Sequence, residues 1–240
     1  MPTITLSHSM MRRIQEINGA IHNKNDLSDL LPKMGCPVEL NDDDDIEIEV
    51  FPDRPDLLSH ETMAKAVRSF QDGDTEVSPV EVSDSGVRIT VEGDLEGVRP
   101  IIMGAIVRGV NTGNSASERD SFIQSLMDHQ EKLHMTLGRK RSLASIGVHD
   151  LSKLKHPFRY ETVSSDFSFQ PLASEDVMSV SEILDSHPKG IEYSKLMDGL
   201  DAYPIILDSN NEVISLPPII NGNHTTVSED TNDFFIDVTG

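Results

Sequence analysis

The chain has 240 residues, a formal net charge of −21 at pH 7, one cysteine and no tryptophan. This length suits one or two domains, and the lone Cys36 excludes a disulfide framework and fits a reducing cytoplasm. The sequence has no apolar run of membrane-spanning length, its start lacks the apolar core of a signal peptide, and its acidic surface repels nucleic acid, so we expect a cytoplasmic protein without membrane contact.

The first 80 residues predict a small α+β domain. Isoleucines and a valine alternate with glutamates over Ile46–Val50, which is typical of a strand with one buried side. The polar stretch Gly73–Pro79 predicts the end of this domain, so we place it at residues 1–80. The other predicted elements are a helix from Ser7 to about Asn18, a helix over Leu27–Met34 ended by Gly35, a solvated turn at Asp42–Asp45, and a helix from Ser59 to Phe70.

Residues 81–240 predict a larger α+β domain. Ser179 and Glu182 have the spacing of a capping box, which predicts a helix of about three turns. Pro188 and Gly190 should interrupt that helix, because proline lacks an N–H and glycine is a poor helix former. The remaining predicted elements are strands over Val87–Val91 and Ile101–Val110, a long helix over Ser117–Leu137, and a proline-broken connection over Lys153–Tyr160.

The long helix contains a polar residue on its apolar stripe. The stripe consists of four residues at helical spacing, Phe122, Leu126, Leu133 and Leu137. Gln130 lies on the same stripe, where a buried amide must be paired. Its side chain is therefore either paired with backbone groups or faces a cleft and binds a ligand. Arg141 follows the helix in a strand-like run and could reach the same cleft.

The middle of the chain is its only basic part. Residues 101–160 carry 9 basic and 5 acidic side chains, whereas the segments on either side are strongly acidic. The basic side chains gather in Arg139–Arg141 and at Lys153, Lys155 and Arg159. Such a patch either contacts phosphate groups or pairs with the acidic surface around it. Under the first interpretation, Arg139 and Lys140 are candidates for binding nucleic acid.

The segment Tyr203–Gly240 predicts a hairpin, a proline-rich loop and a final strand. Asn210 and Asn211 tolerate positive φ, which predicts a two-residue turn between the hairpin strands. That turn pairs Ser209 with Glu212, Leu207 with Ile214, and Ile206 with Ser215. Directly opposed residues point to the same sheet face, so a branched apolar side chain and a hydroxyl should share one face. This combination suits a pocket that binds a ring with a polar tip, and it also suits an ordinary half-buried hairpin.

Common catalytic motifs are missing. The sequence has no Gly-rich phosphate loop, HExxH, paired CxxC or GxSxG. His149 and Asp150 are adjacent at a predicted strand end without a nucleophile beside them. The nine histidines are scattered singly along the chain, so we expect no metal site.

Six sequence blocks resemble one family in order along nearly the whole chain. The resemblance is to the amino-terminal half of the archaeal and eukaryotic-cytosolic type of phenylalanyl-tRNA synthetase beta subunit. PPIIN and DVTG together with LGRKR are specific, whereas DRPDL alone is weaker. The blocks are Asp53–Leu57, Val98–Pro100, Leu137–Arg141, Ala144–Asp150, Pro217–Asn221 and Asp237–Gly240.

The resemblance implies a small α+β domain followed by an editing domain that hydrolyses tRNA(Phe) mischarged with tyrosine. It implies tRNA(Phe) and a catalytic alpha subunit as partners, in an alpha–beta heterotetramer. It implies ATP and Mg²⁺ in the full enzyme and no cofactor in this part of it, which we expect to be a piece of a longer subunit. The editing pocket maps onto catalytic candidates Gln130, Arg141, Asn221 and Asp237 and substrate-binding candidates Ile206, Ser215 and Thr239.

Two other interpretations stay open. This part of the chain could be a non-catalytic module that holds tRNA or the alpha subunit. It could also be a free-standing aminoacyl-tRNA deacylase. Persistence of mischarged tRNA in its presence favours the first alternative.

Overall fold

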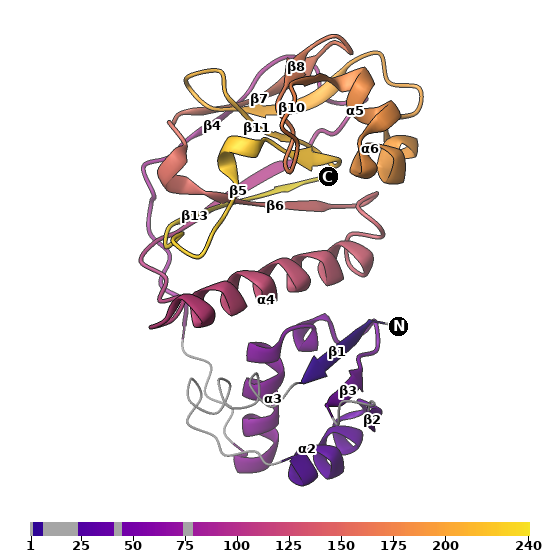
Figure 1. Ribbon diagram of the computed structural model, residues 1–240, viewed down its shortest axis with the longest axis vertical. Coiled ribbons are helices and arrows are strands. Elements are labelled where there is room, and N and C mark those ends of the chain that lie inside the picture. The colour runs from indigo at the N-terminus through magenta and orange to yellow at the C-terminus, as the bar shows by residue number, and fades with distance from the viewer. Residues whose placement is uncertain (1, 7–23, 41–44, 74–78) are drawn as a thin grey trace. The chain divides into compact units, whose positions relative to one another are not determined.

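The computed structural model describes residues 2–6, 24–40, 45–73 and 79–240 (Figure 1). The chain forms two compact units, and helices and mostly antiparallel sheets give it the predicted α+β class. Unit 1 comprises Met1–Glu81 and Gln124–Leu137, and unit 2 comprises Val82–Ile123 and Gly138–Gly240. From the sequence we predicted one domain boundary, after residue 80. In the structure the long helix also contributes to both units, which periodicity within a single helix does not reveal. Within the described ranges, no helix is both long and apolar enough to cross a membrane.

Unit 1 combines a three-stranded antiparallel sheet with short helices. The sheet has the order β1-β3-β2, and the two isoleucines of β3 are buried while its glutamates are half-buried, as the alternation predicted. Gly35, with φ of 83°, ends η1 at the predicted position. The elements are β1 (Thr3–Leu6), α2 (Lys24–Leu30), η1 (Leu31–Met34), β2 (Val38–Leu40), β3 (Ile46–Glu49), η2 (Pro55–Leu57) and α3 (His60–Asp72).

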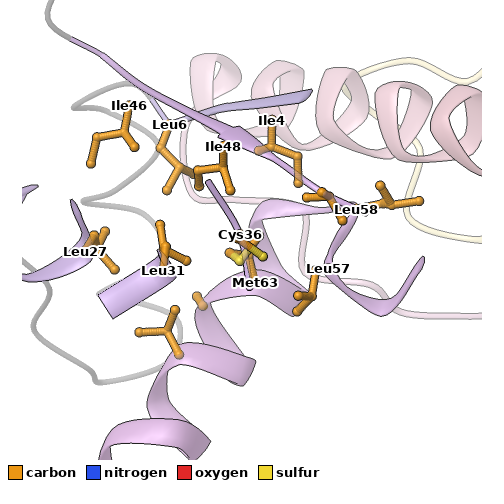
Figure 2. Packing of buried hydrophobic residues seen from close by; sticks show 13 residues of the cluster. Ile4, Leu6, Leu27, Leu31, Cys36, Ile46, Ile48, Leu57, Leu58 and Met63 are labelled. Atoms are coloured by element: carbon orange, nitrogen blue, oxygen red, sulfur yellow. The ribbon is translucent and has the colours of Figure 1, made fainter. Parts of the chain in front are cut away.

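The main core of unit 1 is an apolar cluster, and unit 1 also buries the polar side chains of Ser59, His60, Ser125 and His134. Thirteen buried aliphatic and sulfur-containing side chains from the sheet, α2, η1, η2 and α3 converge there, and Figure 2 shows Leu31, Cys36, Ile48 and Met63 among them. Burial raises the pKa of the Cys36 thiol. The predicted helix from Ser7 to Asn18, and Asp42–Asp44 of the predicted turn, lie outside the described residues.

Capping fixes where two of the predicted helices begin. Ser59 precedes α3 and accepts a hydrogen bond from the Thr62 N–H at 3.2 Å. Ser179 and Glu182 form the complete predicted capping box at the start of α5 (Val180–Ser186). This helix is shorter than the three turns that we predicted, because a second helix, α6 (Pro188–Tyr193), begins one residue after its cap.

Gly190 corrects one prediction. We predicted that it breaks a helix, but it is buried within α6. A Cβ at this position would lie 1.7 Å from the Ile183 carbonyl oxygen of α5. The glycine therefore permits close packing of the two short helices.

Unit 2 stacks two sheets in layers (Figure 1). The five-stranded sheet has the order β12-β11-β10-β7-β4, and the three-stranded sheet has the order β5-β13-β6. A two-stranded ribbon, β8-β9, completes the unit. The strands are β4 (Ile89–Val91), β5 (Ile102–Val107), β6 (Ser145–Asp150), β7 (Phe158–Val163), β8 (Ser168–Phe169), β9 (Met178–Ser179), β10 (Tyr203–Leu207), β11 (Val213–Leu216), β12 (Ile220–Asn221) and β13 (Phe234–Thr239).

The five-stranded sheet is covered on both faces. One face carries Ile205 and Leu207 and packs against α5, α6 and η4 (Ser194–Met197). The other carries Ile206 and packs against Phe235 of β13. Pro204–Leu207 of β10 are therefore buried and Tyr203 is half-buried, which explains the continuous apolar sequence of this strand. The predicted connection over Lys153–Tyr160 instead contains the end of η3 (Leu151–Lys153) and the start of β7. A short η5 (Asn223–Thr225) follows β12.

The long helix is α4 (Ala116–Met135), close to its predicted bounds. The ring centroids of Phe122 and Phe234 are 6.4 Å apart in unit 2, and Leu133 packs against the core of unit 1. Leu137 lies beyond the helix and is 56% exposed, so the predicted stripe was wrong at that residue. The helix ends in a turn two residues before it.

Candidate functional site

Ile206, Ser215 and Asn221 lie on three adjacent strands. Ile206 of β10 is directly opposed to Ser215 of β11, as predicted, and Ser215 is opposed to Asn221 of β12. The Ser215 hydroxyl donates a hydrogen bond of 3.2 Å to Asn221 Oδ1. Ile206 is 0% exposed and Ser215 is 4% exposed, whereas Asn221 is half-buried. A hydroxyl, an amide and an apolar side chain therefore meet in one row across the sheet.

The connection between β10 and β11 differs from its prediction. Asp208 and Glu212 close the loop, because the Asp208 N–H donates to the Glu212 carbonyl oxygen at 3.0 Å. Only Asn211 has positive φ, at 65°, so the predicted two-residue turn is wrong. Leu207 pairs with Val213 rather than with Ile214, since the register shifts after Ile206. The Asp208 carboxylate, which accepts two loop N–H groups, stabilises this longer loop.

Asp237 lies on the central strand of the three-stranded sheet and is 2% exposed. Its Oδ2 is 2.7 Å from Nε2 of His149, a residue of β6 that is 0% exposed. Nδ1 of His149 is 2.9 Å from the hydroxyl oxygen of Thr225, which donates to the Gly222 carbonyl at 3.0 Å. Gly147 is directly opposed to Asp237 on β6. One chain of polar contacts thus runs from Asp237 to the residue after Asn221.

Thr239 belongs to a second polar chain around Arg99. The Arg99 guanidinium donates to the Thr239 hydroxyl at 2.9 Å, to the Thr239 carbonyl at 2.7 Å and to the Ser145 hydroxyl at 3.3 Å. It also donates to the Arg141 carbonyl at 3.2 Å. Burial lowers the pKa of Arg99, and the nearby Tyr160 opposes that shift. Burial likewise raises the pKa of Tyr160.

Arg139, Lys140 and Arg141 form a left-handed turn instead of the predicted strand-like run. Their φ angles are 48°, 55° and 65°. Each such non-glycine residue costs roughly 1–2 kcal/mol. The Leu143 N–H closes the turn by donating to the Gly138 carbonyl at 3.0 Å. The turn leaves Arg139 and Lys140 exposed and Arg141 half-buried.

The Arg141 side chain reaches the loop that precedes Asn221. Its guanidinium donates to the Pro218 and Ile219 carbonyls at 3.2 and 3.1 Å. The same group lies 4.4 Å from the ring centroid of Tyr193, a cation–π contact. Arg141 therefore joins the left-handed turn to the row of Ser215 and Asn221.

The structure links six of the seven predicted pocket residues within unit 2. Arg141 connects to Asn221 through the preceding loop, Asp237 connects through His149 and Thr225, and Thr239 connects through Arg99. Gln130 is half-buried and belongs to unit 1. Gln130 is therefore not a member of the linked set, and its predicted role stays a prediction.

Sequence reasoning missed Arg99 and His149 as members of these networks. His149 and Asp150 point to opposite faces of β6: the first contacts Asp237, and the second accepts from Ser152 and Thr231. The only available signal was that both missed residues lie in blocks of the family resemblance. In the described part of the chain, no group of three or more His, Cys, Asp and Glu side chains is placed to hold a metal ion.

The basic side chains differ in their partners. The Lys153 ammonium donates to the Thr226 carbonyl and lies 3.6 Å from Asp150. Arg159 contacts Glu161 and donates to Asn211. Arg139 and Lys140 form no ion pair with any residue in the described ranges. Arg139 and Lys140 are therefore better placed than Lys153 and Arg159 to contact an external phosphate.

The chemistry of the linked set is polar and largely enclosed. It offers hydroxyls, a carboxylate, an amide and a guanidinium beside an apolar side chain. Ile206, Ser215, Asp237 and Thr239 are at most 4% exposed. Arg141 and Asn221 are half-buried and are therefore the most accessible members of the set.

Comparison with known proteins gives the family. The model of the B3/4 domain matches residues 98–240. An amino-terminal fragment of the phenylalanyl-tRNA synthetase beta subunit from Pyrococcus horikoshii superposes with a TM-score of 0.87 at 31% identity, covering 100% of this chain and 68% of that one. This chain belongs to the phenylalanyl-tRNA synthetase beta-subunit family.

Other relatives within the family are similar over the whole chain. The phenylalanine–tRNA ligase beta subunits of Methanococcoides burtonii and Methanosarcina barkeri are 43% and 45% identical over 240 residues. The chain spans 42% of the length of each of these two subunits.

Proposed function

We propose that unit 2 is the editing module of a phenylalanine–tRNA ligase and that it hydrolyses the ester of tyrosyl-tRNA(Phe). Family membership supports a role in charging or proofreading tRNA(Phe). The observation that carries the finer proposal is the hydrogen bond between Ser215 and Asn221 directly opposite Ile206. It sets a polar group that can bind a phenol hydroxyl next to an apolar side chain that can contact its ring.

Discrimination chemistry explains why such a second site is useful. An apolar pocket shaped for phenylalanine rejects an added hydroxyl only about 100-fold. An editing site must do the reverse and bind the hydroxyl. Phenylalanine entering that site leaves a buried polar group unpaired, which costs about 1–3 kcal/mol or more. The editing site therefore adds selectivity where the synthetic site lacks it.

The proposed roles follow from side-chain chemistry. Ser215 and Asp237 bind the phenol hydroxyl or the ammonium group of the substrate, Ile206 contacts the ring, and Thr239 completes the binding site. Asn221 and Arg141 orient the 3′ end of the tRNA and the attacking water. An aminoacyl ester is already activated, so a positioned water and electrostatic stabilisation suffice without a covalent nucleophile.

Gln130 belongs to unit 1, so this proposal for unit 2 does not include it. The partners in this proposal are tRNA(Phe), contacted by Arg139 and Lys140, and the catalytic alpha subunit, all in the cytoplasm. ATP and Mg²⁺ serve aminoacylation in the remainder of the full enzyme.

The proposal is tested by deacylation. Purified full-length beta subunit with its alpha subunit is mixed with tyrosyl-tRNA(Phe) and, separately, with phenylalanyl-tRNA(Phe), and ester loss is compared with a protein-free control. We expect hydrolysis of the tyrosyl ester well above the control and slow hydrolysis of the phenylalanyl ester. Equal rates for the two esters, or no tyrosyl hydrolysis, would contradict the proposal.

One observation favours a second candidate, a non-catalytic module that holds tRNA or the alpha subunit. Four of the pocket candidates are nearly inaccessible, so a substrate reaches them only if the surrounding loops open. Stable tyrosyl-tRNA(Phe) together with tRNA binding that weakens when Arg139 and Lys140 are replaced would select this alternative.

A further inference from the structure

The most enclosed ionisable pair of unit 2 joins His149 and Asp237. His149 is 0% exposed, Asp237 is 2% exposed, and their Nε2 and Oδ2 atoms are 2.7 Å apart. Desolvating such groups is costly unless each polar atom has a partner. The other imidazole nitrogen, Nδ1, has its partner in the Thr225 hydroxyl at 2.9 Å. Both imidazole nitrogens of His149 therefore have a hydrogen-bond partner.

The carboxylate end fixes the direction of the first hydrogen bond. The Asp237 carboxylate only accepts hydrogen bonds, so the 2.7 Å contact places a hydrogen on Nε2 of His149. At the other end, the Thr225 hydroxyl lies 2.9 Å from Nδ1 of His149 and 3.0 Å from the Gly222 carbonyl oxygen. The imidazole thus joins one fixed oxygen of Asp237 to the backbone of Gly222, the residue after Asn221.

The sequence makes room for this pair at one position. Gly147 is directly opposed to Asp237 on the neighbouring strand. A Cβ at Gly147 would lie 2.0 Å from Asp237 Oδ2 and 2.5 Å from His149 Nε2. Real side chains never approach so closely, so any larger residue here would displace the pair. His149 also stacks on Phe235, with ring centroids 5.6 Å apart, which restricts its rotation.

We propose that His149 is a positioning residue for tyrosyl selection: it holds Asp237 Oδ2 in place and thereby orients the other carboxylate oxygen toward the substrate. The inference rests on the proposed editing function and deepens it. His149 acts through Asp237 and does not touch the substrate. The contact of His149 with Thr225 holds the segment that follows Asn221. The contact of His149 with Asp237 supports selection of the tyrosyl ester.

Two substitutions separate the two contacts. The amide of glutamine reaches the position of Nε2, so His149→Gln keeps a donor for Asp237 and loses the contact with Thr225. The amide of asparagine reaches the position of Nδ1, so His149→Asn keeps the contact with Thr225 and loses the contact with Asp237. The matched control Thr225→Val removes the hydroxyl partner of Nδ1 and leaves both His149 and Asp237 unchanged.

The readout is the ratio of kcat/KM for tyrosyl-tRNA(Phe) to that for phenylalanyl-tRNA(Phe), measured with the full-length subunit and its alpha partner. We expect the ratio to fall about tenfold in His149→Asn, as for one lost charge-assisted hydrogen bond. It should stay within about twofold of the parent in His149→Gln and Thr225→Val. Thermal unfolding of each variant reports its folding separately.

Three results would overturn the inference. The first is an unchanged ratio in a folded His149→Asn variant. The second is a loss in His149→Gln or Thr225→Val as large as the expected tenfold, which would assign the effect to the loop; these two variants decide the matter even if His149→Asn does not fold. The third is a parent enzyme that does not hydrolyse the tyrosyl ester, which would remove the proposed function and this inference together. A parent that edits while all variants match it would overturn the inference alone.

Discussion

The two units bury different polar groups. Unit 1 has a core of thirteen apolar side chains, which stabilise it through their burial, and the polar side chains that it buries are Ser59, His60, Ser125 and His134. Unit 2 has apolar cores as well, but between its sheets it also buries Arg99, His149 and Asp237. Burying such groups costs free energy that hydrogen bonds only offset. The comparison suggests that the polar interior of unit 2 serves the proposed ligand chemistry, whereas the interior of unit 1 serves stability.

The largest expected effect comes from removing the centre of the polar interior. Arg99→Ala leaves the Thr239 and Ser145 hydroxyls and two carbonyls without their shared donor. We expect unit 2 to lose about 4 kcal/mol of unfolding free energy, roughly 1 kcal/mol for each of the four lost hydrogen bonds. Urea denaturation followed by probes in each unit measures this loss.

Leu31→Ala is the matched change in unit 1. Leu31 is 0% exposed, and its truncation should cost about 3 kcal/mol, confined to unit 1. A loss below about 1 kcal/mol for Arg99→Ala would mean that the polar network contributes little to holding unit 2 together.

Helix caps should contribute equally in both units, because capping is local. Ser59→Ala removes the acceptor for the Thr62 N–H, and Ser179→Ala removes one half of the capping box. Each variant should lose about 1 kcal/mol of unfolding free energy, measured by denaturation. The corresponding threonine variants are controls and should retain most of the stability. A cost several times larger in one unit would show that the caps there do more than end a helix.

The contrast between the units also shows what the sequence could predict. Short-range patterns correctly predicted the strand over Ile46–Val50 and the cap at Ser59, because these features depend on neighbours in sequence. The pairing of Ile206 with Ser215 was also confirmed, but the two-residue turn from which we predicted it was wrong. The register shift after Ile206 was not predictable from alternation, because residues on both faces of β10 are apolar. The left-handed turn at Arg139–Arg141 was missed because no glycine marks it.

The candidate site was predictable only in part, for a related reason. The family resemblance gathered residues that the structure links within unit 2. The connecting residues were missed, since His149 and Asp237 are 88 residues apart and Arg99 and Thr239 are 140 apart. No local spacing identifies such partners. Only the assembled sheet, with Gly147 opposite Asp237, brings them together.

The basic turn offers a test of binding outside both interiors. Replacing Arg139 and Lys140 with Ala removes two exposed cations, and tRNA binding should weaken. The slope of log affinity against log salt should fall by about one for each lost phosphate contact. Filter binding with the full-length complex at several salt concentrations measures it, and Lys153→Ala, whose ammonium binds within the chain, is the control. An unchanged slope would mean that the turn only balances the acidic surface.

The smallest expected effect is a pH dependence at Asp150. Burial opposes ionisation of this carboxyl, but hydrogen bonds from Ser152 and Thr231 and the nearby Lys153 lower its pKa overall. Its contribution to stability is therefore present above its unfolded pKa of about 4 and lost as pH falls through the lower folded value. Asp150→Asn should lack that part of the acid destabilisation in urea titrations between pH 7 and pH 2. Identical pH profiles for the variant and the parent would contradict this assignment.

The central claim is that the polar interior of unit 2 selects the tyrosyl ester while the interior of unit 1 does not. The most direct test measures tyrosyl and phenylalanyl ester hydrolysis for Ser215→Ala, Asp237→Ala and Leu31→Ala in the full-length subunit with its partner. Ser215→Ala should lower the tyrosyl preference by the roughly 0.5–1.5 kcal/mol of one hydrogen bond and barely change unfolding, and Asp237→Ala should slow tyrosyl hydrolysis. Leu31→Ala should lower stability and leave the preference unchanged. If folded Ser215→Ala and Asp237→Ala variants both hydrolyse the tyrosyl ester like the parent, these residues are structural and the editing site lies elsewhere.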